Sequence, residues 1–125
     1  MYNNFEKWIE HILNQELPSG IIALNFNLYE EGFDVWSMEL VGTSSFDKDD
    51  EDWACDEIFN TRDAQLKWEQ KSRWEVILEE ISSIISEYLE KGQCSEKLKA
   101  YEGIGIGFVD GDIKLLYSIE GREDT

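Results

Sequence analysis

The sequence predicts an α+β fold: an antiparallel sheet of about four strands, made of two hairpins, packed against a long central helix and an N-terminal helix. Two observations lead to this prediction. Two stretches carry apolar residues at helical spacing, and two pairs of shorter stretches alternate between apolar and wetter positions. The chain has 125 residues, 42% of them hydrophobic, which is enough apolar surface for a core. We therefore expect one domain, residues 1–125.

The first half of the chain predicts a helix followed by a hairpin. Asn3 and Glu6 form an N-cap pattern, and the helix should end before Pro18. Its apolar face is made of Phe5, Trp8, Ile9, Ile12 and Leu13. Residues 22–29 and 36–41 then alternate as strands, with a turn at Glu30, Glu31 and Gly32 between them. These two strands should pair with each other.

A long connection precedes the main helix. It can hold a short extended piece near residues 53–59, whereas residues 65–69 fit a strand and a helix almost equally well. Ser72 and Glu75 have the spacing of a capping box, and Lys91–Gly92 is a typical helix end. The stripe between them comprises Trp74, Ile77, Leu78, Ile81, Ile84, Ile85, Tyr88 and Leu89.

The C-terminal part predicts a second hairpin. Residues 95–101 can form one or two helical turns, after which residues 104–109 and 113–117 alternate as strands. Asp110–Gly111 is typical of a tight two-residue turn between them. From Gly121 onward the chain reads as a polar end. The glycines at 103, 105 and 107 alternate within the strand, so they indicate room for a closely packed group, such as an aromatic ring, rather than a phosphate loop.

Carboxylates dominate the composition and gather in one window. The chain holds 28 acids and 11 bases, a formal net charge of -17. Residues 47–57, which we call the acidic loop, contain seven carboxylates, one lysine and one tryptophan. An anionic patch with an aromatic ring inside it is typical of a protein contact. The alternative is a solvated loop without a partner. The candidate partner-binding residues are Asp47, Asp49, Asp50, Glu51, Asp52, Trp53, Asp56 and Glu57.

The tryptophans divide by predicted face. Trp8, Trp36 and Trp74 fall on apolar faces and should lie in the core. Trp53, among acids, can be half exposed, or its ring can fold back over the edge of the sheet.

The negative charge excludes two classes of partner, and other features of the sequence indicate the location and the state of the cysteines. Nucleic acids and anionic membranes would repel a chain with a pI near 4.2. The first twenty residues contain glutamates and no unbroken apolar run, so we expect no signal peptide, no membrane span and a cytoplasmic location. Cys55 and Cys94 belong to no metal-ligand motif, so both should be free thiols.

Catalytic chemistry finds little support in the sequence. The only histidine, His11, falls off the apolar arc of the first helix, so a nucleophile would have no imidazole partner. The acidic loop does not match a calcium loop, because Asp52 stands at the glycine position and Ile58 at the final glutamate position. We expect a protein that is not an enzyme and needs no cofactor or metal.

A family resemblance gives these features a function. Residues 52–59 (DWACDEIF) and 103–113 (GIGIGFVDGDI), with the helix between them, look like the small acidic immunity proteins of bacterial polymorphic-toxin and contact-dependent growth inhibition systems. The resemblance implies a cytoplasmic protein that binds one cognate toxin domain, often a basic nuclease, and blocks its active site or a nearby surface. The alternative function is an acidic adaptor or regulatory module for another basic protein.

Overall fold

The computed structural model describes residues 1–119. The polar end predicted from Gly121 onward lies outside the described residues. Two of the elements, η1 and η2, are short 3₁₀ helices. In chain order the elements are α1 (Tyr2–Leu13), β1 (Ala23–Gly32), β2 (Val35–Thr43), η1 (Glu51–Cys55), β3 (Glu57–Asn60), η2 (Arg62–Ala64), β4 (Leu66–Glu69), α2 (Trp74–Lys91), α3 (Ser95–Lys99), β5 (Gly103–Phe108) and β6 (Lys114–Ser118).

The sheet is mixed and has six strands. Its order is β3-β2-β1-β5-β6, and β4 also pairs with β2, beyond β3 along the same edge. Both predicted hairpins are confirmed, since β1–β2 and β5–β6 are antiparallel. The prediction of about four antiparallel strands is wrong, because β1 and β5 pair in parallel and β3 and β4 are additional strands. Alternation of apolar and polar residues indicates that a segment is a strand. Which other strand it pairs with depends on how the connections cross the sheet.

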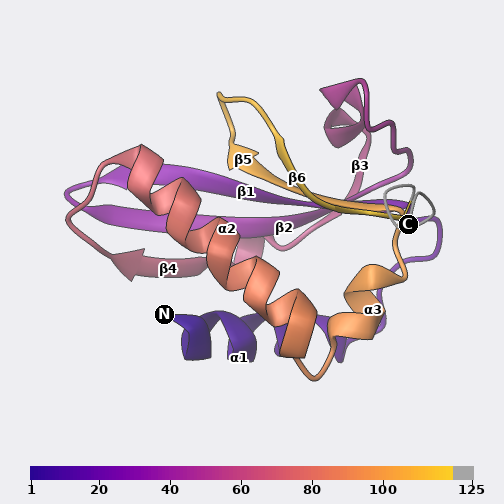
Figure 1. The fold of residues 1–125 in the computed structure, drawn as a ribbon, viewed down its shortest axis with the longest axis horizontal. Helices are drawn as coiled ribbons and strands as arrows, with labels where there is room; N and C mark the ends of the chain where they lie inside the picture. Colours follow the sequence, from indigo (N-terminus) through magenta and orange to yellow (C-terminus); the bar gives the residue numbers. More distant parts are fainter. Residues whose placement is uncertain (120–125) are drawn as a thin grey trace.

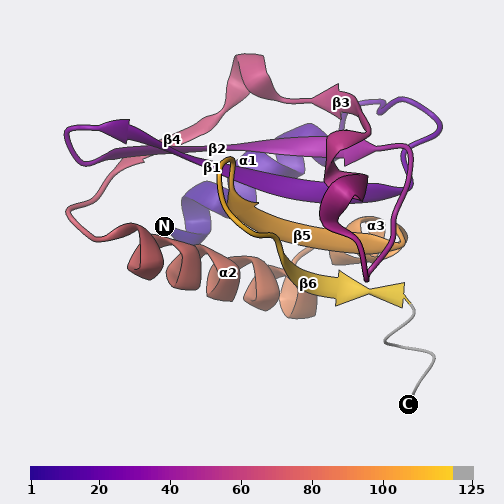
Figure 2. The same ribbon diagram turned by 90° about the horizontal axis from the view of Figure 1, so that it is seen from above.

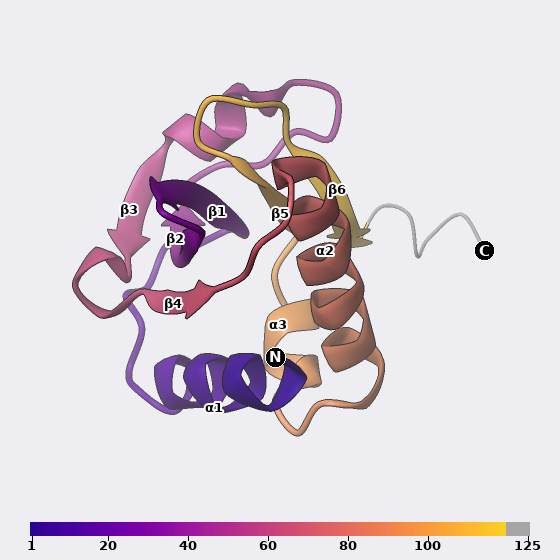
Figure 3. The same cartoon turned by 90° about the vertical axis from the view of Figure 1, so that its left-hand side faces the viewer.

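The helices α1, α2 and α3 cover one face of the sheet (Figure 1). In Figure 1, α1 and α3 lie below the strands, whereas the β5–β6 loop and the segment leading into β3 lie above them. Figures 2 and 3 show α2 running beside β5 and β6. The core lies between the strands and these helices. Its strand residues are Leu24, Phe26, Leu28, Trp36, Met38, Leu40, Ile104 and Ile106. Its residues on α2 include Ile77, Ile81, Ile85 and Tyr88.

The two predicted N-caps are wrong. Helix α1 begins at Tyr2 with Met1 as its N-cap, two residues earlier than the Asn3 pattern suggests. Helix α2 has Arg73 as its N-cap, with no side-chain hydrogen bond. Ser72 instead accepts a hydrogen bond from Gln70, 3.2 Å away. A capping box requires the serine itself to be the N-cap, and here Arg73 holds that position while the Ser72 hydroxyl is engaged with Gln70.

Both hairpin turns also differ from the prediction. The first turn lies at Phe33 and Asp34, with φ angles of 54° and 63°, rather than at residues 30–32. The second connection runs from Val109 to Ile113, and neither Asp110 nor Gly111 has a positive φ, so no tight two-residue turn forms. The longer loop contacts the acidic loop, since the backbone amide of Ile113 donates to Glu51.

The structure gives the conformation of the two segments of the long connection that the sequence left open. Residues 66–69 form strand β4, and β3 provides the extended piece expected near residues 53–59. Trp53 itself belongs to η1. Within residues 1–119, no helix is both long enough and apolar enough to cross a membrane.

Candidate functional site

The face of the sheet opposite the helices, which we call the open face, is polar at its centre. Because side chains alternate along a strand, the partners of the core residues point to this side. On β1 these are Asn25, Asn27 and Tyr29, and Asn27 lies opposite Glu39 of β2. Strand β5 presents glycines to the same face, with Gly105 paired to Asn25. A polar strip therefore runs beside a strip that lacks side chains.

Two aromatic rings fill the space above the glycines. A Cβ on Gly103 would overlap the ring of Phe46, and one on Gly105 would lie 3.4 Å from the Trp53 ring. The two rings meet edge to face, with centroids 5.1 Å apart. The prediction that the glycines make room for an aromatic ring is confirmed. Trp53 is only 5% exposed, so the half-exposed interpretation is wrong and the ring folds back over the sheet.

The other tryptophans follow the core prediction in part. Trp36 is buried, as predicted, and Trp8 is half-buried against the core. Trp74 is 51% exposed, which contradicts the prediction. Trp74 is the first residue of α2, so its ring lies at the end of the stripe, where it meets the Phe108 ring edge to face with centroids 5.9 Å apart.

The carboxylates of the acidic loop all lie at the surface, as its sequence suggests. Some of them shape the loop. Asp50 caps η1 by accepting from the amide of Asp52 at 3.0 Å, and Asp56 accepts from the Ser45 hydroxyl at 2.5 Å. Asp47 accepts from the amide of Asp49 at 2.9 Å. The loop is therefore a folded segment with a defined shape, and its carboxylates remain exposed to solvent.

Two acids of the loop remain available to a partner. Within residues 1–119, the side chains of Asp49 and Asp52 have no hydrogen-bond or ion-pair partner. Glu57 is different, because its carboxylate lies 2.7 Å from Arg62. That hydrogen bond lowers the pKa of Glu57 below its usual value.

A buried carboxylate, missed from the sequence, anchors the polar strip. Glu39 is 0% exposed and pairs with Arg62 at 2.9 Å. It also accepts hydrogen bonds from Tyr29 and Asn27. Burial, reinforced by the neighbouring Glu39, raises the pKa of Tyr29 to about 12. The only sequence signal was a charged residue within an apolar strand, and nothing local indicates that Arg62 would reach it.

Two cavities flank the β5–β6 loop. The first, which we call the acid-rimmed cavity, measures about 310 Å³ and lies between the open face and η1. It is lined by Asn25, Asn27, Glu51, Asp52, Ala54, Cys55, Phe108, Val109, Gly111 and Ile113. The sequence placed Glu51 and Asp52 in the candidate site, but it gave no indication that Asn25 or Ile113 would join them.

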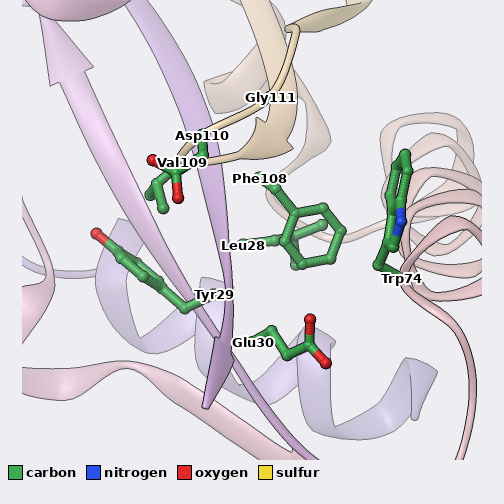
Figure 4. Close-up of a pocket in the computed structure, with 8 residues that line it drawn as sticks. All are labelled: Leu28, Tyr29, Glu30, Trp74, Phe108, Val109, Asp110 and Gly111. Atoms are coloured by element: carbon green, nitrogen blue, oxygen red, sulfur yellow. The ribbon is translucent and has the colours of Figure 1, made fainter. Parts of the chain in front are cut away.

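The second cavity measures about 580 Å³ and lies where β1 extends past the end of β5. Figure 4 shows the Phe108 ring between Leu28 and the indole of Trp74, with Val109 and Asp110 on the loop beside them. Glu30 provides a carboxylate at the other side of this hollow. The walls are aromatic and aliphatic, and the charged groups are acidic.

The remaining candidates for chemistry are the two cysteines, the histidine and any cluster of metal-binding side chains. Both cysteines are free thiols, with Cys55 exposed and Cys94 buried. His11 is exposed, as predicted. Residues 1–119 contain no cluster of three or more histidine, cysteine, aspartate or glutamate side chains placed to hold a metal ion.

Comparisons with protein-family models, with curated proteins and with solved structures found no match to this chain.

Proposed function

We propose that this protein is an immunity protein that binds and neutralises a basic, nuclease-like toxin domain through the acidic loop. The observation that carries the proposal is the fixing of the loop: seven carboxylates stay at the surface of a segment that Trp53 and Phe46 hold against the sheet. A pre-shaped surface loses little conformational entropy on binding, so more of the interaction energy contributes to affinity.

The charge suits a basic partner. A nuclease displays lysine and arginine around its cleft to attract phosphate, and carboxylates can accept the same bidentate hydrogen bonds from arginine. A field of opposite sign also speeds the encounter, by about 10 to 10³-fold at low salt. Fast capture matters for an inhibitor whose target is toxic to its own cell.

The apolar part of the interface needs other residues than Trp53. Ile58 and Val109 are 45% and 47% exposed. Ile58 directly follows the acidic loop, in β3. Val109 lines the acid-rimmed cavity together with residues of the acidic loop. Exposed apolar side chains surrounded by charges are typical of the centre of a protein interface. We assign these two residues the anchoring role that the sequence had assigned to Trp53.

A growth-rescue assay tests this function. Cells that express a toxin domain encoded beside this chain should survive when the wild-type protein is co-expressed. The double variant Asp49→Asn/Asp52→Asn should rescue less well, because both side chains lack partners within the described fold and their loss leaves the loop intact.

The matched control is Glu79→Gln/Glu90→Gln on α2, which removes the same charge from exposed positions outside the loop. Rescue should be retained in this variant. Equal loss in both double variants would mean that net charge, rather than the acidic loop, governs binding. Absence of rescue by the wild type would reject the toxin as the partner.

A further inference from the structure

The acid-rimmed cavity has an unsatisfied acceptor among the residues that line it. Asn25 is 2% exposed, and its Oδ1 accepts no hydrogen bond from any part of residues 1–119. Its amide nitrogen is already engaged, donating to Asn27 Oδ1 at 2.7 Å. Buried polar atoms are nearly always hydrogen-bonded, so an orphan carbonyl at a cavity requires an explanation.

The orphan oxygen points toward Gly105, at a place that the side chains of Ile113 and Trp53 cover. It lies 2.7 Å from the point where a Cβ on Gly105 would stand, and a methyl group of Ile113 lies 2.8 Å from the same point. Ile113 also lines the cavity and belongs to the β5–β6 loop. A guest in the cavity has to displace this side chain to reach the carbonyl of Asn25.

The mouth of the cavity provides negative charge. Asp52 has no side-chain partner within the described residues, and Glu51 uses Oε1 to accept from the Ile113 amide, leaving Oε2 for another donor. No lysine or arginine is among the lining residues. The cavity therefore offers carboxylates at its mouth, and the unpaired carbonyl of Asn25 becomes a further acceptor when Ile113 moves.

We propose that the acid-rimmed cavity binds one arginine side chain of the basic partner. A guanidinium carries five N–H donors in a plane, so it can meet acceptors at several positions at once, and it is more weakly hydrated than an ammonium group. A volume of about 310 Å³ lies at the small end of ligand sites, which suits a side chain better than a larger molecule. This inference rests on the proposed function, since it names the group by which the partner is recognised.

Nuclear magnetic resonance with N-acetyl-L-argininamide as the probe tests the site on the whole protein. The side-chain amide signals of Asn25 and Asn27 and the backbone signal of Ile113 should shift and saturate together. N-acetyl-L-lysinamide should bind about tenfold more weakly, and neutral N-acetyl-L-norleucinamide should cause no shift. Equal binding of the arginine and lysine probes, or shifts confined to the surface acids, would overturn the proposal.

Two variants separate the cavity from general charge attraction. Asp52→Asn should weaken binding of the arginine probe about tenfold, as the loss of one charge-assisted hydrogen bond predicts. Asp49→Asn removes the same charge from the same loop but lies outside the lining, so binding should be nearly unchanged. Equal effects of the two substitutions would overturn the proposal.

Alkylation of Cys55 provides an independent readout. Its thiol is exposed and lines the cavity, whereas Cys94 is buried and serves as an internal reference. The arginine probe should slow the reaction of Cys55 with iodoacetamide, and an unchanged rate at saturating probe would contradict the site. Because no toxin is present, failure here combined with loop-dependent growth rescue rejects only the arginine site. Probe binding without growth rescue rejects the toxin function instead.

Discussion

At the scale of single residues, Trp53 joins the acidic loop to the sheet. Its ring packs beside Phe46 and above Gly105, and it is almost fully buried. Trp53→Ala should therefore lower the free energy of unfolding by about 3 to 5 kcal/mol, the range for removing a large buried aromatic side chain. Urea denaturation measures this loss.

The control for Trp53 is Trp74→Ala. That ring is half exposed at the start of α2, so its removal should cost only about 1 kcal/mol. If Trp53→Ala leaves stability unchanged and instead speeds dissociation of a bound partner, the ring is an interface anchor rather than a part of the core.

Arg62 neutralises a carboxylate that has no contact with water. Arg62→Met would leave Glu39 buried without a cation, and breaking such a pair destabilises a fold. The expected loss is about 2 kcal/mol, less than for a fully buried pair because half of the Arg62 side chain stays in water. Arg73→Met, which breaks an exposed pair with Glu75, should have no measurable effect in the same denaturation experiment. Equal effects would mean that Glu39 does not depend on Arg62.

The same arginine predicts a pH dependence at Glu57. Because the Arg62 hydrogen bond lowers the pKa of Glu57 in the folded protein, the carboxylate stabilises the fold above its unfolded pKa of about 4.3. That contribution is lost as pH falls through the lower folded pKa. Wild type should therefore be more stable than Glu57→Gln at pH 6, and the difference should vanish toward pH 2. A constant difference across this range would contradict the assignment.

At the scale of elements, the glycine strand β5 and the acidic loop form one unit. A side chain at Gly103 would meet the Phe46 ring, so Gly103→Val should destabilise the protein by about 1 to 3 kcal/mol through overpacking. Amide hydrogen exchange should also quicken in residues 46–56, because the ring that holds the loop is displaced.

Gly111→Ala is the matched control for Gly103. A Cβ at Gly111 meets nothing closer than 3.6 Å, and its φ is not positive. Stability should change by less than about 0.5 kcal/mol. Unchanged exchange in the loop of Gly103→Val would show that the loop does not depend on this packing.

Element boundaries show which sequence signals are reliable here. The stripe between Trp74 and Leu89 lies within α2, where one face contacts the sheet and the other meets water. Terminal details were less predictable. Trp74 has the correct helical phase and still lies half in solvent, because burial at a helix end depends on the neighbouring loop.

At the scale of the molecule, the net charge of -17 should control association. The Debye length shrinks from about 10 Å at 0.1 M salt to about 3 Å at 1 M salt, so the association rate with a basic partner should fall steeply over that range. Stopped-flow measurement with the toxin domain gives this rate directly, and the dissociation rate should change less. A rate independent of salt would assign recognition to apolar residues such as Ile58 and Val109.

The sequence by itself determined what depends on local pattern: two helical stripes, two hairpins, the acidic loop and glycines that leave room for a ring. The tertiary structure alone decided which distant segments meet. The parallel pairing of β1 with β5 brings Asn25 beside Gly105, and the position of Arg62 allows Glu39 to be buried. Such contacts join residues more than twenty positions apart, and their free energy depends on shared burial, which no local spacing encodes.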